Sequence, residues 1–196
     1  MVKKVTSTKI LIKFLDDYGK RYYLKEIAEK LETSHQAIKP YLENLVSKKI
    51  LIKIKRKNLI EYLLNFENKQ IYSYLSVAEH ENLIKILNQE IILKTLFEKL
   101  SCFFDKNIFI LFGSSTEKIR KGSDIDLLVI GKVKLDKFLE EFEQIYNKEI
   151  HLVQVNSLEK ISEVLRKEIY KKHLIFNNSE QVIRFFGGLY EKNKLV

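Results

Sequence analysis

The chain has 196 residues, 45% of them hydrophobic, so it can bury at least one sizeable core and wholesale disorder is excluded. Its only cysteine, Cys102, excludes an intramolecular disulfide and a thiolate zinc site, and the four histidines show no ligand spacing. No apolar run approaches the roughly 18 residues that a membrane helix needs, and the polar start does not resemble a signal peptide. We therefore expect a cytoplasmic protein with no membrane partner.

The positive charge is concentrated near the N-terminus. The formal net charge is +9, and residues 1–65 hold 15 of the 35 Lys and Arg but only 7 of the 26 Asp and Glu. The rest of the chain is nearly balanced. This asymmetry predicts that the first third meets a polyanion and that the remainder has another task.

Three helices and a hairpin are predicted in the first third. Apolar residues at helical spacing indicate one helix ending before Gly19 and another over residues 23–31. The run from Thr33 to Gln36 has the form of a capping box with Thr33 as N-cap, so a third helix should follow. That helix contains Pro40, and a shorter helix beginning at Pro40 is the alternative. Two strands, 50–57 and 59–64, are expected to join at Lys57-Asn58.

This order of elements resembles the winged helix-turn-helix domains of prokaryotic transcription regulators, although Glu32 occupies the turn position where such domains often have Gly. The resemblance implies double-stranded DNA as a partner, with the third helix in the major groove and the wing on the backbone. It also implies a homodimer, because such domains usually read paired half-sites. The residues expected to face bases are Ser34, His35, Gln36 and Lys39, and those expected to meet phosphates are Lys53, Lys55, Arg56 and Lys57. A protein-interaction domain with a solvated basic face is the alternative.

The middle of the chain reads as a helical connector. Residues 66–100 contain no Gly or Pro and carry Leu and Ile at helical spacing. We expect this stripe to pack on a flanking domain or on a second copy.

Two buried strands in the second half carry the most informative residues. The apolar run 107–112 stops at Gly113-Ser114, and a second strand over 123–131 begins with Asp124 and Asp126. Strand alternation places the two carboxylates on one face, where they repel unless a cation neutralises them. Oxygen ligands suit Mg²⁺, and two ions about 3.5–4 Å apart are the usual clamp for displacement at phosphorus. The Gly-Ser bend offers N–H groups and a hydroxyl to a phosphate chain.

The segment "LFGSSTEKIRKGSDIDLLVIG" resembles the nucleotidyltransferases of the DNA polymerase beta superfamily, most closely the minimal prokaryotic members, and the likeness covers about 101–196. The resemblance implies that a nucleoside monophosphate is transferred from a triphosphate, with ATP expected, to a hydroxyl, assisted by two Mg²⁺ ions. The residues it assigns are Gly113, Ser114 and Ser123 to the nucleotide, and Asp124 and Asp126 to metal binding and catalysis.

One position departs from the family pattern. The third carboxylate of the family lies on the following strand, where this chain has His151. Glu149, two residues earlier on the same face, is the alternative third metal ligand. Without that carboxylate the site loses an anionic ligand and the likely base, so retained catalysis stays open.

We thus expect an α+β protein with a winged helix-turn-helix domain (1–66), a helical connector (67–100) and a nucleotidyltransferase-type α/β domain with a small mixed sheet (101–196). The leading hypothesis is a DNA-binding regulator that binds Mg-NTP. The alternatives are an antitoxin-type adenylyltransferase acting on a toxin partner, a catalytically degenerate nucleotide-sensing regulator, and an RNA-modifying enzyme.

Overall fold

The computed structural model of the protein describes residues 5–57, 59–116, 118–119 and 122–192. The chain divides into two compact units, one formed by Met1–Glu81 with Ile183–Val196 and the other by Asn82–Val182. Both division points fall inside helices, α4 (Ile71–Leu87) and α8 (Ser179–Glu191). This division groups most of α8 with the N-terminal unit, whereas the sequence analysis placed it in residues 101–196. Among the described residues no helix is long and apolar enough to cross a membrane.

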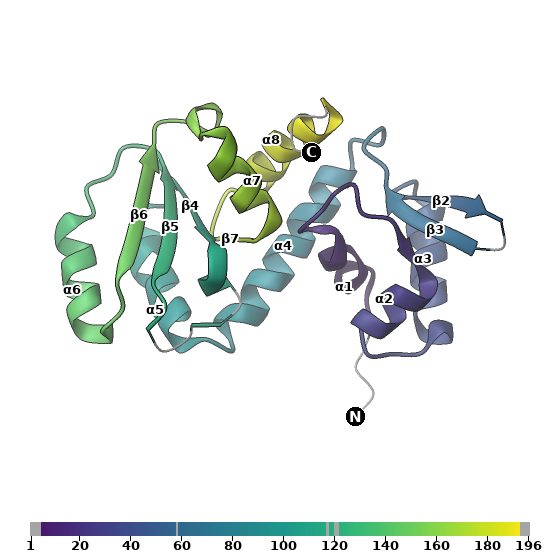
Figure 1. The fold of residues 1–196 in the computed structure, drawn as a ribbon, viewed down its shortest axis with the longest axis horizontal. Coiled ribbons are helices and arrows are strands. Elements are labelled where there is room, and N and C mark those ends of the chain that lie inside the picture. Colours follow the sequence, from purple (N-terminus) through teal and green to yellow (C-terminus); the bar gives the residue numbers. More distant parts are fainter. Residues whose placement is uncertain (1–4, 58, 117, 120–121, 193–196) are drawn as a thin grey trace. The chain divides into compact units, whose positions relative to one another are not determined.

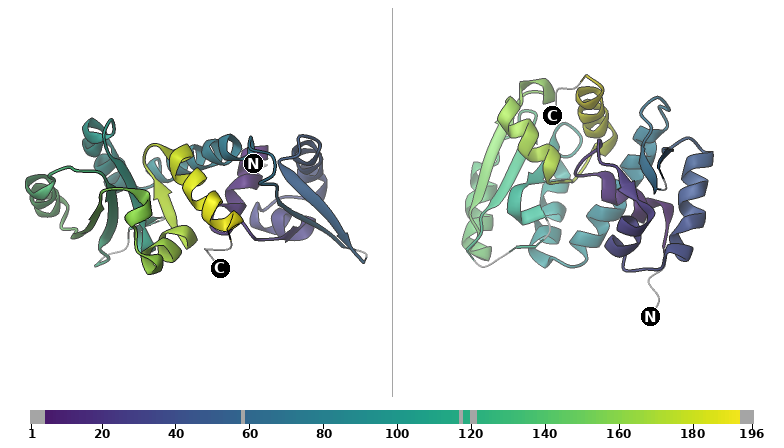
Figure 2. Two further views of the ribbon diagram at one scale, coloured as in Figure 1. Left: turned by 90° about the horizontal axis from the view of Figure 1, so that it is seen from above. Right: turned by 45° about the vertical axis from the view of Figure 1, so that its right-hand side comes forward.

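The first unit has the winged helix-turn-helix fold. Its three-stranded antiparallel sheet has the order β1-β3-β2, and the β2–β3 hairpin projects as the wing (Figures 1 and 2). The elements are α1 (Ser7–Leu11), a 3-10 turn (Ile12–Phe14), β1 (Tyr22–Tyr23), α2 (Leu24–Lys30), α3 (His35–Ser47), β2 (Leu51–Arg56) and β3 (Leu59–Leu64). The predicted wing turn lies partly outside the described residues, because Asn58 is not among them.

The cap of α3 corrects the sequence analysis. The N-cap is Ser34 rather than Thr33: the Ser34 hydroxyl accepts a hydrogen bond from the Ala37 N–H at 3.2 Å, so Gln36 is not the N3 residue. The preceding turn is left-handed at Glu32, with φ of 51°, and forms without the usual glycine. The longer form of the helix is confirmed, because Pro40 lies inside α3.

The end of α8 packs within the first unit. A Cβ at Gly187 would lie 2.6 Å from the ring of Tyr72, so this glycine lets α8 approach α4 closely. Glu191 then accepts hydrogen bonds from Lys69 (2.7 Å) and from the Tyr72 hydroxyl (3.0 Å). The pKa of Tyr72 is raised to about 12, mainly by burial of its hydroxyl and secondly by its hydrogen bond to Glu191.

The second unit is built on the small mixed sheet that the sequence predicts. The strand order is β6-β5-β4-β7, with β4 antiparallel to both β5 and β7 and with β5 parallel to β6 (Figure 1). The further elements are α5 (Ile91–Leu100), β4 (Ile108–Phe112), β5 (Ile125–Ile130), α6 (Asp136–Tyr146), β6 (Ile150–Val155), α7 (Glu163–Lys171) and β7 (His173–Ile175).

Residue alternation along the strands separates a core face from a second face. Phe109, Leu111, Leu127 and Val129 share one face by register and join a buried cluster with residues of α5 and with Phe142 of α6. Burial of each of these aliphatic and aromatic side chains stabilises the folded chain by about 1.5–3 kcal/mol relative to leaving it exposed. The alternate positions therefore point to the opposite face, and Asp126 is one of them.

Candidate functional site

The bend after β4 is a tight 3-10 turn over Gly113–Thr116. Buried Thr116 donates its hydroxyl to the Gly113 carbonyl at 3.0 Å, and buried Ser115 donates to the Phe112 carbonyl at 3.4 Å. Sequence reasoning missed these two positioning residues, although a Ser-Ser-Thr run after glycine is a signal for such local side-chain bonds. Ser114 remains exposed at the bend.

Gly113 lies directly against the carboxylate of Asp126. Its φ is +71°, and a Cβ placed there would be 2.7 Å from Asp126 Oδ2. The contact follows from strand register, because Asp126 pairs with Phe112, the residue just before the bend. Only glycine combines this backbone conformation with this approach.

The parallel strand β6 brings His151 to the other side of Asp126. The two residues are register partners, and His151 Nδ1 lies 3.4 Å from Asp126 Oδ1. The Asp126 side chain is 27% exposed and that of His151 is 70% exposed. The sheet therefore assembles the bend, one carboxylate and one imidazole at a single edge.

Asp124 belongs to a second, adjoining group. It lies just before β5, is exposed, and lines a pocket of about 380 Å³ together with Gly122, Ser123 and Glu149. Lys148 also lines this pocket and donates a hydrogen bond to the Ser123 carbonyl at 3.2 Å, so a cation accompanies the acids. Asp126 and His151 do not line this pocket.

The donor set fits a divalent ion only in part. Within the described residues, no group of three His, Cys, Asp or Glu side chains could hold a metal ion. Mg²⁺ is often held by one or two carboxylates with the remaining ligands from phosphates and water. Asp126 at the bend and Asp124 in the adjoining pocket each offer one such carboxylate, whereas a site with three His, Cys, Asp or Glu ligands is not present in the described part of the chain.

The exposed start of α3 is the candidate base-reading surface. His35, Gln36 and Lys39 are exposed, and Ser34 is exposed as well but its hydroxyl already caps the helix. On the opposite face of α3, Ile38, Leu42 and Leu45 are fully buried. The helix is thus anchored on one side and presents polar side chains on the other.

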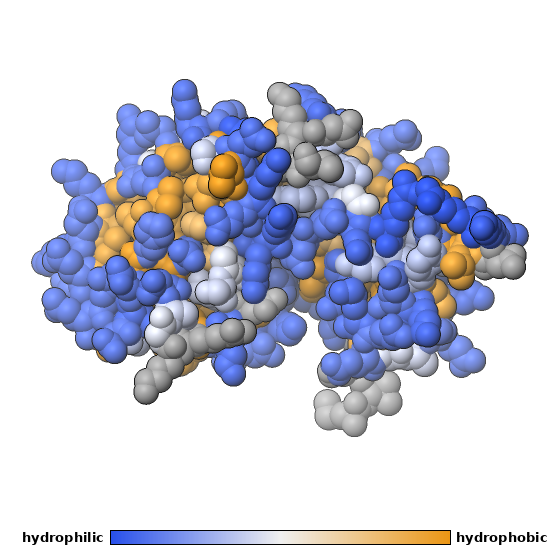
Figure 3. All heavy atoms as spheres, viewed as in Figure 1, coloured by the Kyte–Doolittle hydropathy of each residue, from blue (hydrophilic) through white to orange (hydrophobic). Residues whose placement is uncertain are grey.

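Among the residues that the structure describes, some cations of the wing form an ion pair and others do not. Figure 3 shows hydrophilic residues along β2. Lys53 Nζ lies 2.7 Å from Glu43 of α3, and this hydrogen bond raises the pKa of Lys53. Arg56 pairs with buried Glu61 at 3.4 Å. Lys55 and Lys57 are exposed and form no ion pair within the described part of the chain.

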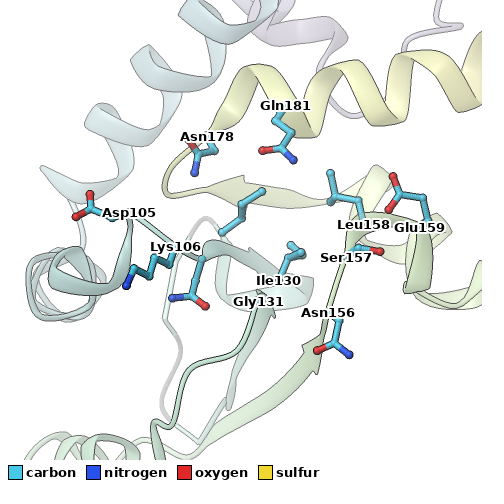
Figure 4. Close-up of a pocket in the computed structure, with 12 residues that line it drawn as sticks. Asp105, Lys106, Ile130, Gly131, Asn156, Ser157, Leu158, Glu159, Asn178 and Gln181 are labelled. Carbon is cyan, nitrogen blue, oxygen red and sulfur yellow. The ribbon is translucent and has the colours of Figure 1, made fainter.

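A further pocket of about 290 Å³ lies at the opposite end of the sheet (Figure 4). Gly131 follows β5, Asn156 and Ser157 follow β6, and Asn178 and Gln181 stand at the start of α8. Of the described residues that line it, none belongs to the site predicted from sequence.

Comparison with known proteins identifies the C-terminal part of the chain. Residues 96–181 match the family model described as Polymerase beta, Nucleotidyltransferase, and this segment is a nucleotidyltransferase domain of that family. A comparison with curated proteins found no match.

Solved structures similar to this chain come from two kinds of protein. A mutant form of the toxin–antitoxin MntA–HpeT has a TM-score of 0.39 and 18% identity, covering 52% of this chain and 88% of that chain. The adhesin competence repressor AdcR from Streptococcus pyogenes has a TM-score of 0.35 and 16% identity, covering 53% of this chain and 81% of that chain. A putative transcriptional regulator from Rhodococcus sp. RHA1 has a TM-score of 0.29 and 17% identity, covering 69% of this chain and 47% of that chain.

Proposed function

We propose that this protein is a DNA-binding regulator whose nucleotidyltransferase domain binds a nucleoside triphosphate, with ATP expected, together with divalent metal, expected as Mg²⁺. The observation that carries the proposal is the close approach of Gly113 to Asp126. A bend with exposed backbone and a serine hydroxyl, placed against a carboxylate, can bring phosphates and a metal-binding group together.

The roles of the chain's residues follow from their chemistry. Gly113 and Ser114 would receive the phosphate chain, Ser123 would approach the nucleotide, and Asp124 and Asp126 would hold metal. When bound, divalent metal polarises the phosphoryl oxygens and neutralises developing charge. In the transfer, the acceptor hydroxyl gives its proton to water and its oxygen bonds to the α-phosphorus, while the bond from that phosphorus to the bridging oxygen breaks and pyrophosphate leaves.

Incubation with ATP labelled at the α-phosphate tests the enzyme hypothesis. We expect label on an acceptor, and loss of that label when Asp124→Ala and Asp126→Ala are combined. Asp105→Ala removes a carboxylate beside the pocket at the far end of the sheet and should leave incorporation unchanged. Protease or ribonuclease sensitivity of the label distinguishes a protein acceptor, such as a toxin partner, from RNA. Equal labelling by the wild type and the double variant refutes the assignment.

A nucleotide-sensing domain without turnover is the second candidate, and His151 favours it. An imidazole stands where the family carries its third carboxylate, and the described residues contain no three-ligand group. This candidate predicts saturable nucleotide binding that depends on Asp126, with no label transferred to protein or RNA and no pyrophosphate released.

The DNA-binding half is supported by the exposed polar start of α3 and by the exposed lysines Lys55 and Lys57 of the wing. We expect sequence-selective binding whose affinity falls steeply with salt. The pair Lys55→Gln and Lys57→Gln should weaken binding to all sequences and reduce the salt slope by about 1 for each lost phosphate contact. Lys137→Gln with Lys167→Gln, on α6 and α7, removes the same charge elsewhere and is the matched control. Binding without sequence preference refutes this half of the proposal.

A further inference from the structure

The carboxylate of Asp126 is held between two different neighbours. Its Oδ2 faces the Gly113 bend, and its Oδ1 faces His151 Nδ1 at 3.4 Å. The residue pair comes from adjacent parallel strands in register, so its position is determined by backbone hydrogen bonding rather than by flexible loops.

The separation of the two donors is informative. Charge-assisted hydrogen bonds between imidazolium and carboxylate are typically about 2.7–2.9 Å long, so 3.4 Å is long for a strong direct bond. Two donors on one metal ion, each at about 2.1 Å and subtending about 90–110°, lie roughly 3.0–3.4 Å apart. The pair therefore forms a long hydrogen bond in this structure, and its spacing is also one that two ligands of a shared ion adopt.

The chemistry of the donors limits which ion is favoured. Mg²⁺ prefers oxygen ligands and releases its water reluctantly. Imidazole favours first-row transition ions, whose affinity for mixed nitrogen and oxygen sites rises along the series from Mn²⁺ to Cu²⁺. An imidazole in place of a carboxylate thus lowers the affinity for Mg²⁺ and retains affinity for a transition ion.

We propose that His151 and Asp126 bind one ion together and that His151 makes this site prefer a first-row transition ion over Mg²⁺. The inference rests on the proposed function, in which this edge of the sheet holds metal and triphosphate. It assigns His151 as the residue that determines metal specificity, with the other ligands supplied by phosphates and water.

Direct binding tests the inference without recourse to turnover. Mn²⁺ and Mg²⁺ are titrated into the full chain by calorimetry, at one pH, in the presence of a non-hydrolysable ATP analogue. We expect Mn²⁺ to bind the wild type about tenfold or more tightly than Mg²⁺. His151→Ala should weaken Mn²⁺ by about tenfold or more and leave Mg²⁺ nearly unchanged. Co²⁺ adds a spectroscopic readout, because loss of a nitrogen ligand changes its visible absorption bands.

His151→Asp provides the opposite perturbation. Restoring a carboxylate at this position should tighten Mg²⁺ and remove the preference for Mn²⁺, a gain that a misfolded variant could not give. Asn156→Asp adds a carboxylate beyond the far end of β6, away from the Asp126–His151 pair, and is the matched control. This control should bind both ions as the wild type does.

The outcomes separate this inference from the function on which it rests. If His151→Ala leaves the ratio of Mn²⁺ to Mg²⁺ affinity unchanged while Asp126→Asn abolishes binding of both ions, the role of His151 is wrong and the metal–nucleotide site stands. If the wild type binds neither ion in the presence of nucleotide, both are wrong.

Discussion

Replacing Gly113 by alanine would test the geometry on which the site depends. The residue has φ of +71°, a conformation that costs an L-residue about 1–2 kcal/mol. The new methyl group would also lie 2.7 Å from Asp126 Oδ2, which is closer than real side chains approach. The Asp126 carboxylate would have to turn away, at an additional cost of roughly 0.5–1.5 kcal/mol.

Gly122→Ala is the matched control, because the two glycines share the backbone cost and differ in their surroundings. Gly122 has φ of +78°, and a Cβ there would meet no atom within 4 Å. We expect Gly122→Ala to lose about 1–2 kcal/mol of unfolding free energy, which lowers the melting temperature by about 2–8 °C, and Gly113→Ala to lose about 1.5–3.5 kcal/mol. Gly113→Ala alone should also lose metal affinity, because only that variant displaces a proposed ligand.

Two measurements separate these effects. Urea unfolding followed by circular dichroism gives the stability of each variant, and titration of divalent metal in the presence of a non-hydrolysable ATP analogue gives the affinity. We expect Gly113→Ala to bind metal about tenfold or more weakly than Gly122→Ala. Equal affinities for the two variants would show that the bend and Asp126 do not act together, and would remove the main support for the site.

The docking of α8 and the pH dependence of its end give two further predictions. Gly187→Ala should destabilise the protein by about 1–3 kcal/mol, because its methyl group meets Tyr72. Gly188→Ala, which has open space around it, should be neutral or stabilise the protein by up to about 1 kcal/mol. Equal unfolding free energies of the two variants in urea would contradict the packing of Gly187 against Tyr72. The hydrogen bond from Lys69 holds the pKa of Glu191 below its usual 4.5. The ionised carboxylate therefore stabilises the folded protein fully above pH 4.5, and this contribution is lost as the pH falls through the lowered pKa. Glu191→Gln should therefore lower stability by less than about 1 kcal/mol at neutral pH and approach the wild type in acid, and a constant difference at all pH values would contradict this.

The local features that carried the predictions are short-range in origin. Helical spacing of apolar residues and uninterrupted apolar runs reflect burial of one face, and each is visible within a few turns or one strand. The individual helices and strands were predicted on that basis. The winged helix-turn-helix fold, the mixed sheet and the nucleotidyltransferase domain were predicted from the resemblance of these segments to known families, and they are confirmed. The third helix was also predicted through Pro40, since its buried face continues past that residue.

Errors occurred where neighbouring residues offered equivalent choices. Thr33 and Ser34 are both good N-caps, and the left-handed turn at Glu32 decides that the helix starts one residue later. The strand Tyr22–Tyr23 is too short to show a period, and its pairing with β3 alone makes it a strand. The assignment of Lys53 and Arg56 to phosphates followed from the winged-helix resemblance and stays a prediction; in the folded chain both side chains also pair with acids.

The order of the elements, their buried faces and the residues available for chemistry were determined by the sequence, because each depends on interactions between residues close in the chain. The tertiary structure alone decided which of those residues meet. Antiparallel pairing of β4 with β5 sets Gly113 beside Asp126, and parallel pairing of β5 with β6 sets His151 on its other side. The register partners of Asp126 are Phe112 and His151, which lie 14 and 25 residues away in the chain. A pattern of neighbouring residues does not show which distant residue a strand position will pair with.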